Sequence, residues 1–143
     1  MRHEYFKKVG PALRVPEWRI VQMLRRQHEA DRLEAELAGA IGLERARACV
    51  DGFAQLMALM RLHAWHPMLI LRPGAEGVSD DERNLARFVL LSAEQDREAA
   101  LVEAMAIVVP QAILPLVAAG ERVGLPLLCE ECRDRLDCPL TFQ

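Results

Sequence analysis

The sequence predicts an all-α, single-domain bundle of about five helices, with an irregular connector at residues 66–78 and a cysteine-containing C-terminal tail. Hydrophobic residues make up 52% of the 143-residue chain, whereas aromatic residues make up only 5%. The apolar side chains are therefore mainly Leu, Ala, Val, Ile and Met, most of which favour helices. Val and Ile do not alternate with polar residues over any long run, so a β-sheet is not expected.

The length of the chain limits the number of domains that it can form. A chain of 143 residues is the size of one domain with one hydrophobic core. We expect an N-terminal arm at 1–15, a helical domain at 16–128 and a C-terminal cysteine tail at 129–143, packed on the same domain. The N-terminus has no uninterrupted apolar stretch, so no secretory leader is expected and the predicted location is cytoplasmic. All basic residues except Lys7 and Lys8 are Arg, which is typical of a GC-rich, bacterial genome.

The first predicted helix spans residues 16–39. Pro16 suits the first turn of a helix, because a backbone N–H at that position has no partner within the helix in any case. Apolar residues then recur at roughly helical spacing, at Trp18, Val21, Leu24, Leu33, Leu37 and Ile41. Gly39 and Gly42 weaken the end of this helix.

The second predicted helix runs from Leu43 to Trp65, and its last turns are apolar on most sides. An apolar stripe this wide is typical of a central helix with neighbours on two sides. Met57 and Met60 lie in the stripe. They are predicted to fill the core, with the lining of a cofactor site as the alternative.

An irregular connector is predicted at residues 66–78. Pro67 disfavours the α conformation at His66 and so ends the second helix. Residues 68–71 then form a short apolar run. Such a run predicts a buried extended connector or, alternatively, a single β-strand, which would need a partner strand from another chain.

Three further helices are predicted after the connector. The segment Ser79–Glu82 is a capping box, with a Ser at the N-cap and a Glu three residues later, so a third helix begins here. A fourth helix begins near Asp96, and Pro110 ends or kinks it. A fifth helix is expected over residues 111–122, with Gly124 just past its end.

The most apolar stretch is 104–120, which contains no charged residue. It is shorter than the roughly 20 residues of a transmembrane helix, and Pro110 and Pro115 interrupt it, so no membrane span is predicted. The rest of the fold or a second copy of the chain must therefore cover it. We expect a homodimer whose interface is formed by the fourth and fifth helices or by the end of the second.

The charge distribution argues against nucleic acid as a partner, because the net charge is −3. Residues 1–32 carry eight basic and four acidic side chains, whereas residues 76–103 carry three basic and eight acidic ones. We expect two solvated surfaces of opposite charge. The alternative is that the two segments meet, within one fold or between two copies.

The cysteines supply one recognisable spacing, Cys129-x-x-Cys132-x5-Cys138. Structural zinc takes four thiolate or imidazole ligands, and the candidate set is these three cysteines with His66. The fourth ligand has alternatives in Cys49, His63, His3 and Asp137. A redox pair, an iron–sulfur cluster completed by Cys49, and free or structural thiols are the other interpretations.

No catalytic constellation or nucleotide-phosphate motif is visible in the sequence. The sequence therefore predicts a small cytoplasmic, non-enzymatic interaction or regulatory module that needs no cofactor. One alternative is a zinc-binding or thiol-redox protein that uses the C-terminal cysteines. Another is a helical protein whose apolar pocket binds a hydrophobic ligand.

Overall fold

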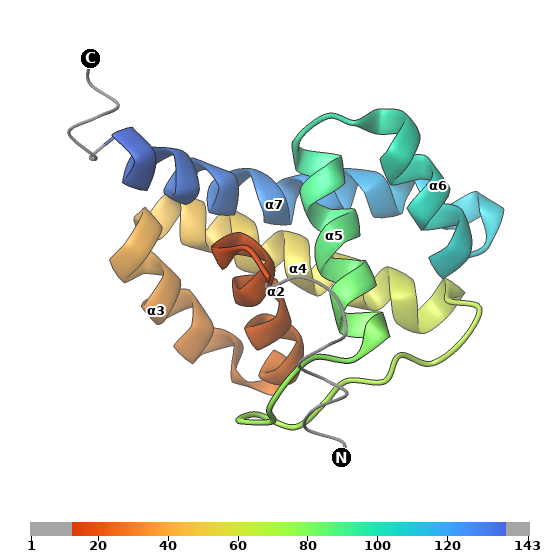
Figure 1. The fold of residues 1–143 in the computed structure, drawn as a ribbon, viewed down its shortest axis with the longest axis horizontal. Helices are drawn as coiled ribbons and strands as arrows, with labels where there is room; N and C mark the ends of the chain where they lie inside the picture. The colour runs from red at the N-terminus through yellow and green to blue at the C-terminus, as the bar shows by residue number, and fades with distance from the viewer. Residues whose placement is uncertain (1–12, 137–143) are drawn as a thin grey trace.

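The computed structural model describes residues 13–136, with side chains as far as residue 131, and it is an all-α bundle (Figure 1). This confirms the predicted fold class. The described helices are α2 (Val15–Arg25), α3 (Ala30–Ile41), α4 (Leu43–His63), α5 (Asp80–Ala93), α6 (Arg97–Ile107) and α7 (Ile113–Leu136), with the 3₁₀ turns η1 (Gln27–Glu29) and η2 (Pro110–Ala112). Within these residues there is no β-strand, only an isolated bridge between Ala64 and Val108.

Helices α4 and α7 form the central pair and run side by side along the molecule (Figure 1). The Sγ atom of Cys49 on α4 lies 3.5 Å from the carbonyl oxygen of Val123 on α7. Helix α5 crosses this pair, α3 lies along α4, and α6 packs near the start of α7. The core between them contains the largest inaccessible side chains, among them Phe88, Ile20, Leu56, Leu85, Leu116 and Leu127.

The prediction of one helix over residues 16–39 is wrong, because the chain changes direction after Arg25. Helix α2 packs on α5, whereas α3 packs on α4. The break lets each half bury its own apolar residues: Ile20, Val21 and Leu24 in α2, and Leu33, Leu37 and Ile41 in α3. Neither Gly nor Pro occurs at residues 26–30, so no local signal marks the turn.

The last predicted helix, over residues 111–122, is also corrected by the structure. Helix α7 continues to Leu136 and contains both Gly124 and Pro126. Gly124 does not end the helix but allows close packing, since a Cβ atom at this position would lie 2.7 Å from the Cβ of Ala93 on α5. The described part of the predicted cysteine tail is therefore a continuation of α7.

The uncharged stretch 104–120 is partly covered by the fold itself. One side of it is buried, at Ala104, Val108, Ala112, Leu116, Val117 and Ala119. By length and composition alone, the helical segment Pro110–Glu131 is long and apolar enough to cross a membrane, and half of its most apolar window is buried inside the fold. Met105 and Leu114 remain 60% and 66% exposed, so the fold leaves part of this stretch uncovered.

Candidate ligand-binding pocket

A buried ion pair fixes the connector between α4 and α5 onto α2. Arg25 donates from Nε and Nη2 to the two carboxylate oxygens of Glu82, at 2.9 and 3.0 Å, and both side chains are almost inaccessible to solvent. The guanidinium also donates to the carbonyl oxygens of Ala75 and Gly77, at 3.2 and 2.8 Å. This network gives each buried charge several partners. It joins α2, the connector and α5 at one point.

The predicted capping box completes this arrangement. Ser79 caps α5: its hydroxyl accepts from the backbone N–H of Glu82 at 3.1 Å, and the Glu82 carboxylate accepts from the N–H of Ser79 at 2.9 Å. The same carboxylate accepts from the N–H of Leu71 at 3.1 Å, and the Ser79 hydroxyl donates to the carbonyl of Leu69 at 2.5 Å. The residues that begin α5 therefore also hold the connector.

The pKa of the Glu82 carboxyl lies below its usual value of 4.5. Burial raises this pKa, but the hydrogen bonds from Arg25 and from the backbone N–H groups of Ser79 and Leu71, together with the positive charge of Arg25, more than offset that effect. Glu82 is therefore ionised at neutral pH, and the clamp on the connector is intact there.

The other end of the connector is tied to the corner between α6 and α7. Ala64 pairs with Val108 in the isolated bridge. The backbone N–H of Trp65 donates to the carbonyl of Ile107 at 3.0 Å, and its indole Nε1–H donates to the carbonyl of Met105 at 3.1 Å. Both ends of the connector are thus fixed, and its middle part forms a wall along the bundle.

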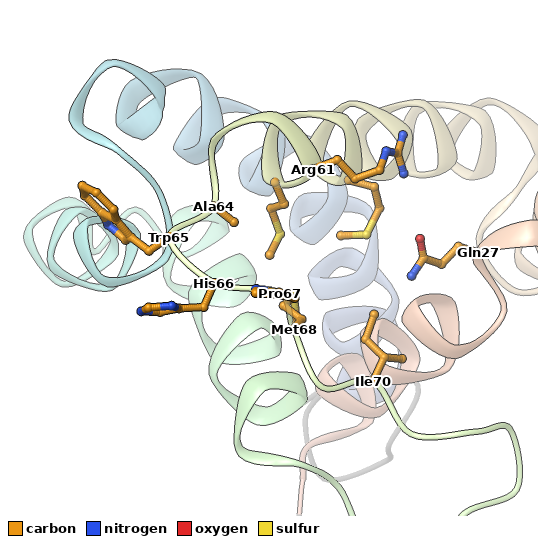
Figure 2. A pocket seen from close by; sticks show the side chains of 10 residues that line it. Gln27, Arg61, Ala64, Trp65, His66, Pro67, Met68 and Ile70 are labelled. Atoms are coloured by element: carbon orange, nitrogen blue, oxygen red, sulfur yellow. The ribbon is translucent and has the colours of Figure 1, made fainter.

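A pocket of about 440 Å³ lies between this wall and α4 (Figure 2). Helix α4 contributes Met57 and Met60, and the connector contributes Met68 and Ile70. The full lining consists of Gln27, Met57, Met60, Arg61, Ala64, Trp65, His66, Pro67, Met68 and Ile70. Met57 and Met60 are nearly buried, in agreement with the prediction that they fill the core. They also line this pocket.

The polar side chains of the lining are Gln27, Arg61 and His66. Figure 2 shows Gln27 and Arg61 on the same side of the pocket, with His66 and Trp65 on the opposite side. Smaller hollows border the pocket, one of about 150 Å³ that shares Arg61 and one of about 130 Å³ that shares His66. Arg61 and His66 therefore each border a second hollow besides the pocket.

The structure places two of the candidate zinc ligands, His66 and Cys129, at opposite ends of the α4–α7 pair. His66 follows the end of α4, whereas Cys129 is exposed on the second half of α7, near the beginning of α4. Among the described residues, no three His, Cys, Asp or Glu side chains are close enough to hold a metal ion. The side chain of Cys132 and all of Cys138 lie outside the described residues, so a metal site among the C-terminal cysteines stays a prediction.

The two glutamates after Cys129 form ion pairs with Arg19 of α2 and with Arg14, the residue just before α2. Arg19 donates from Nε and Nη2 to the carboxylate of Glu130, at 3.1 and 2.7 Å. Arg14 donates from Nη2 to Glu131 at 2.7 Å. The segments 1–32 and 76–103 themselves meet within one copy of the chain, through the buried pair of Arg25 and Glu82 and through Arg14, which lies 3.3 Å from Glu94. The structure therefore agrees with the alternative prediction, in which the basic and acidic segments meet, and not with the expected pair of separate solvated surfaces.

Cys49 is not suited to thiolate chemistry. Its thiol is buried, its S–H donates to the carbonyl of Val123 at 3.5 Å, and burial raises its pKa to about 12. The thiol therefore remains protonated at neutral pH, which makes it a poor nucleophile and a poor metal ligand.

The sequence predicts an apolar pocket only as an alternative, with Met57 and Met60 as possible lining residues, and it does not locate the rest of the site because the lining comes from three separate segments. Gln27 belongs to η1, Arg61 to α4 and His66 to the connector, and no local motif links them. The one available signal was the methionine stripe of α4, which is typical of a core helix as well. Comparisons with protein-family models, with curated proteins and with solved structures found no match to the chain.

Proposed function

We propose that the protein is a non-enzymatic binding module that holds a small, largely apolar molecule in the pocket beneath the connector. The observation that carries this proposal is a pocket of about 440 Å³ between α4 and a wall that is fixed at both ends. Its volume and mostly apolar lining are typical of small-molecule sites. A wall that is ordered before binding also lowers the entropic cost of association.

The chemistry of the lining favours binding over catalysis. The lining contains no hydroxyl, thiol or carboxylate side chain, so His66 has neither a nucleophile nor an acidic partner within the pocket. Met57, Met60 and Met68 supply flexible, polarisable side chains that adapt to ligands of different shape. These features support a tolerant apolar binding site.

A charge placed in the pocket wall is expected to weaken the binding of an apolar probe. Met68→Glu should lower the affinity for 1-decanol, measured by isothermal titration calorimetry, by about tenfold or more, because the ligand would desolvate the new carboxylate. Leu69→Glu is the matched control. It adds the same charge at the next residue, whose side chain is 62% exposed and does not line the pocket, so binding should remain as in the unmodified protein.

Circular dichroism shows whether both variants are folded. If Met68→Glu is folded and binds 1-decanol as well as Leu69→Glu does, the ligand does not occupy this pocket and the proposal is wrong.

Self-association is a second candidate function, favoured by exposed apolar side chains at the end of the molecule where α4, α6 and α7 meet. Trp65 and Met105 contact each other there through a hydrogen bond. The exposed fractions are 77% for Leu62, 51% for Trp65, 65% for Val102, 60% for Met105 and 66% for Leu114. Large apolar side chains that stay exposed are typical of interfaces. They lie on the elements from which the sequence predicts a homodimer interface.

Light scattering tests this second candidate. The unmodified chain should have the mass of a dimer, and Met105→Glu should reduce it to the 16.1 kDa of one copy. Leu43→Glu, at the opposite end of α4 and also half exposed, should leave the dimer intact. A mass of 16.1 kDa for the unmodified chain at high concentration contradicts the candidate.

A further inference from the structure

The polar side of the pocket suggests the chemical class of the ligand, and this step rests on the proposed binding function. We infer that the ligand is a free, single-chain amphiphile whose carboxylate head binds Arg61 and Gln27 and whose apolar chain lies against the methionines. Arg61 is the one side chain of the lining that carries a charge at neutral pH irrespective of its surroundings. Gln27 supplies an amide donor on the same side of the pocket (Figure 2).

Arg61 has no carboxylate partner among the described residues, whereas six other arginines do. Ion pairs with Glu side chains are formed by Arg14, Arg19, Arg25, Arg26, Arg32 and Arg87. Among the described residues, no Asp or Glu lies within ion-pair distance of Arg61, and none lines either the pocket or the adjoining hollow that shares Arg61. An acidic group on the ligand would therefore find a guanidinium that the fold leaves unpaired.

The rest of the site sets the orientation of such a ligand. Two acidic side chains, Asp81 and Glu103, line the neighbouring hollow that shares His66. They disfavour an anionic head at that end. Met57, Met60 and Met68 also line the pocket and suit an alkyl chain. A single guanidinium neutralises one negative charge, so the lining matches a carboxylate better than a doubly charged phosphate monoester.

The experiment compares probes with the same chain and different heads. By isothermal titration calorimetry at pH 7 and physiological ionic strength, the full chain should bind decanoate about tenfold more tightly than 1-decanol, because a charged hydrogen-bonded pair is added. Decyl phosphate should bind no more tightly than decanoate. Arg61→Gln should remove the preference, so that decanoate binds no more tightly than 1-decanol does to the same variant.

Arg45→Gln is the matched control. Arg45 is exposed near the start of the same helix and does not line the pocket, so this variant removes the same charge and should keep the preference for decanoate. Equal binding of decanoate and 1-decanol by the unmodified chain overturns the carboxylate inference but leaves the apolar pocket in place. Tighter binding of decyl phosphate, or a preference for decanoate that survives Arg61→Gln, also overturns it. Failure of both decanoate and 1-decanol to bind contradicts the proposed function itself.

Discussion

Replacing Glu82 by Gln is expected to lower the free energy of unfolding by about 3–5 kcal/mol, because it leaves the guanidinium of Arg25 buried without a counter-charge. The side chain of Arg25 is 1% exposed and that of Glu82 is inaccessible, so solvent cannot replace the lost partner. Urea denaturation followed by circular dichroism measures the change. Arg25→Met combined with Glu82→Gln should be more stable than Glu82→Gln alone, since the double variant buries no unpaired charge.

An exposed ion pair of similar geometry is the control for this prediction. Arg26 donates from Nη1 and Nη2 to the two carboxylate oxygens of Glu36, at 3.0 and 2.7 Å, but the side chain of Glu36 is 54% exposed. Because solvent screens this pair, Glu36→Gln should leave the unfolding midpoint nearly unchanged. If Glu82→Gln is as stable as Glu36→Gln, the buried pair does not hold the connector as described.

The pH dependence of stability follows from the lowered pKa of Glu82. A carboxyl whose pKa is lower in the folded state stabilises the fold above its unfolded pKa, and this contribution is lost as the pH falls through the folded pKa. The usual value is 4.5, so the clamp should contribute fully near neutral pH and weaken progressively in acid below that value. The difference in stability between the unmodified chain and Glu82→Gln should therefore shrink as the pH is lowered.

Replacing Gly124 by Ala is expected to destabilise the fold by about 1–3 kcal/mol, because α5 and α7 are too close for an added methyl group. The new Cβ would lie 2.7 Å from the Cβ of Ala93 and 2.9 Å from the carbonyl oxygen of Val89. The second of these atoms belongs to the backbone of α5, so relief requires the helices to move apart. This cost exceeds the gain in helix propensity of roughly 1 kcal/mol that Ala brings.

Replacing Gly39 by Ala should instead stabilise the fold. Gly39 lies in α3, and nothing is within 4 Å of the position that its Cβ would occupy. Gly39→Ala should therefore raise the free energy of unfolding by up to about 1 kcal/mol. A stabilising effect of both substitutions would contradict the close contact between α5 and α7.

Local signals in the sequence predicted the elements that depend on local chemistry. The capping box from Ser79 to Glu82 placed the start of α5 correctly, because an N-cap satisfies backbone groups within the next few residues. Asp96 likewise accepts from the N–H of Ala99 at the start of α6. The irregular connector followed from Pro67, which fixes its own backbone and restricts that of His66.

The features that the sequence did not predict correctly depend on contacts between helices that are distant in the sequence. Gly124 carries the sequence signature of a helix end, but its role is to let α7 approach α5. The break after Arg25 has no local mark, since it depends on α2 packing against α5 while α3 packs against α4. The pocket depends in turn on this break, because the turn after α2 brings Gln27 to the same side of the pocket as Arg61 (Figure 2).

The central claim is that the pocket beneath the connector holds an apolar ligand. Its most direct test is NMR of the methionine methyl groups. The full chain is labelled at the methionine methyl groups and titrated with 1-decanol, and each resonance is assigned by a Met→Leu variant. The signals of Met57, Met60 and Met68, which line the pocket, should shift together and saturate, while that of the exposed Met105 stays in place. Saturable shifts at Met105 with none at the three pocket methionines, or no shift at any methionine, would contradict the account.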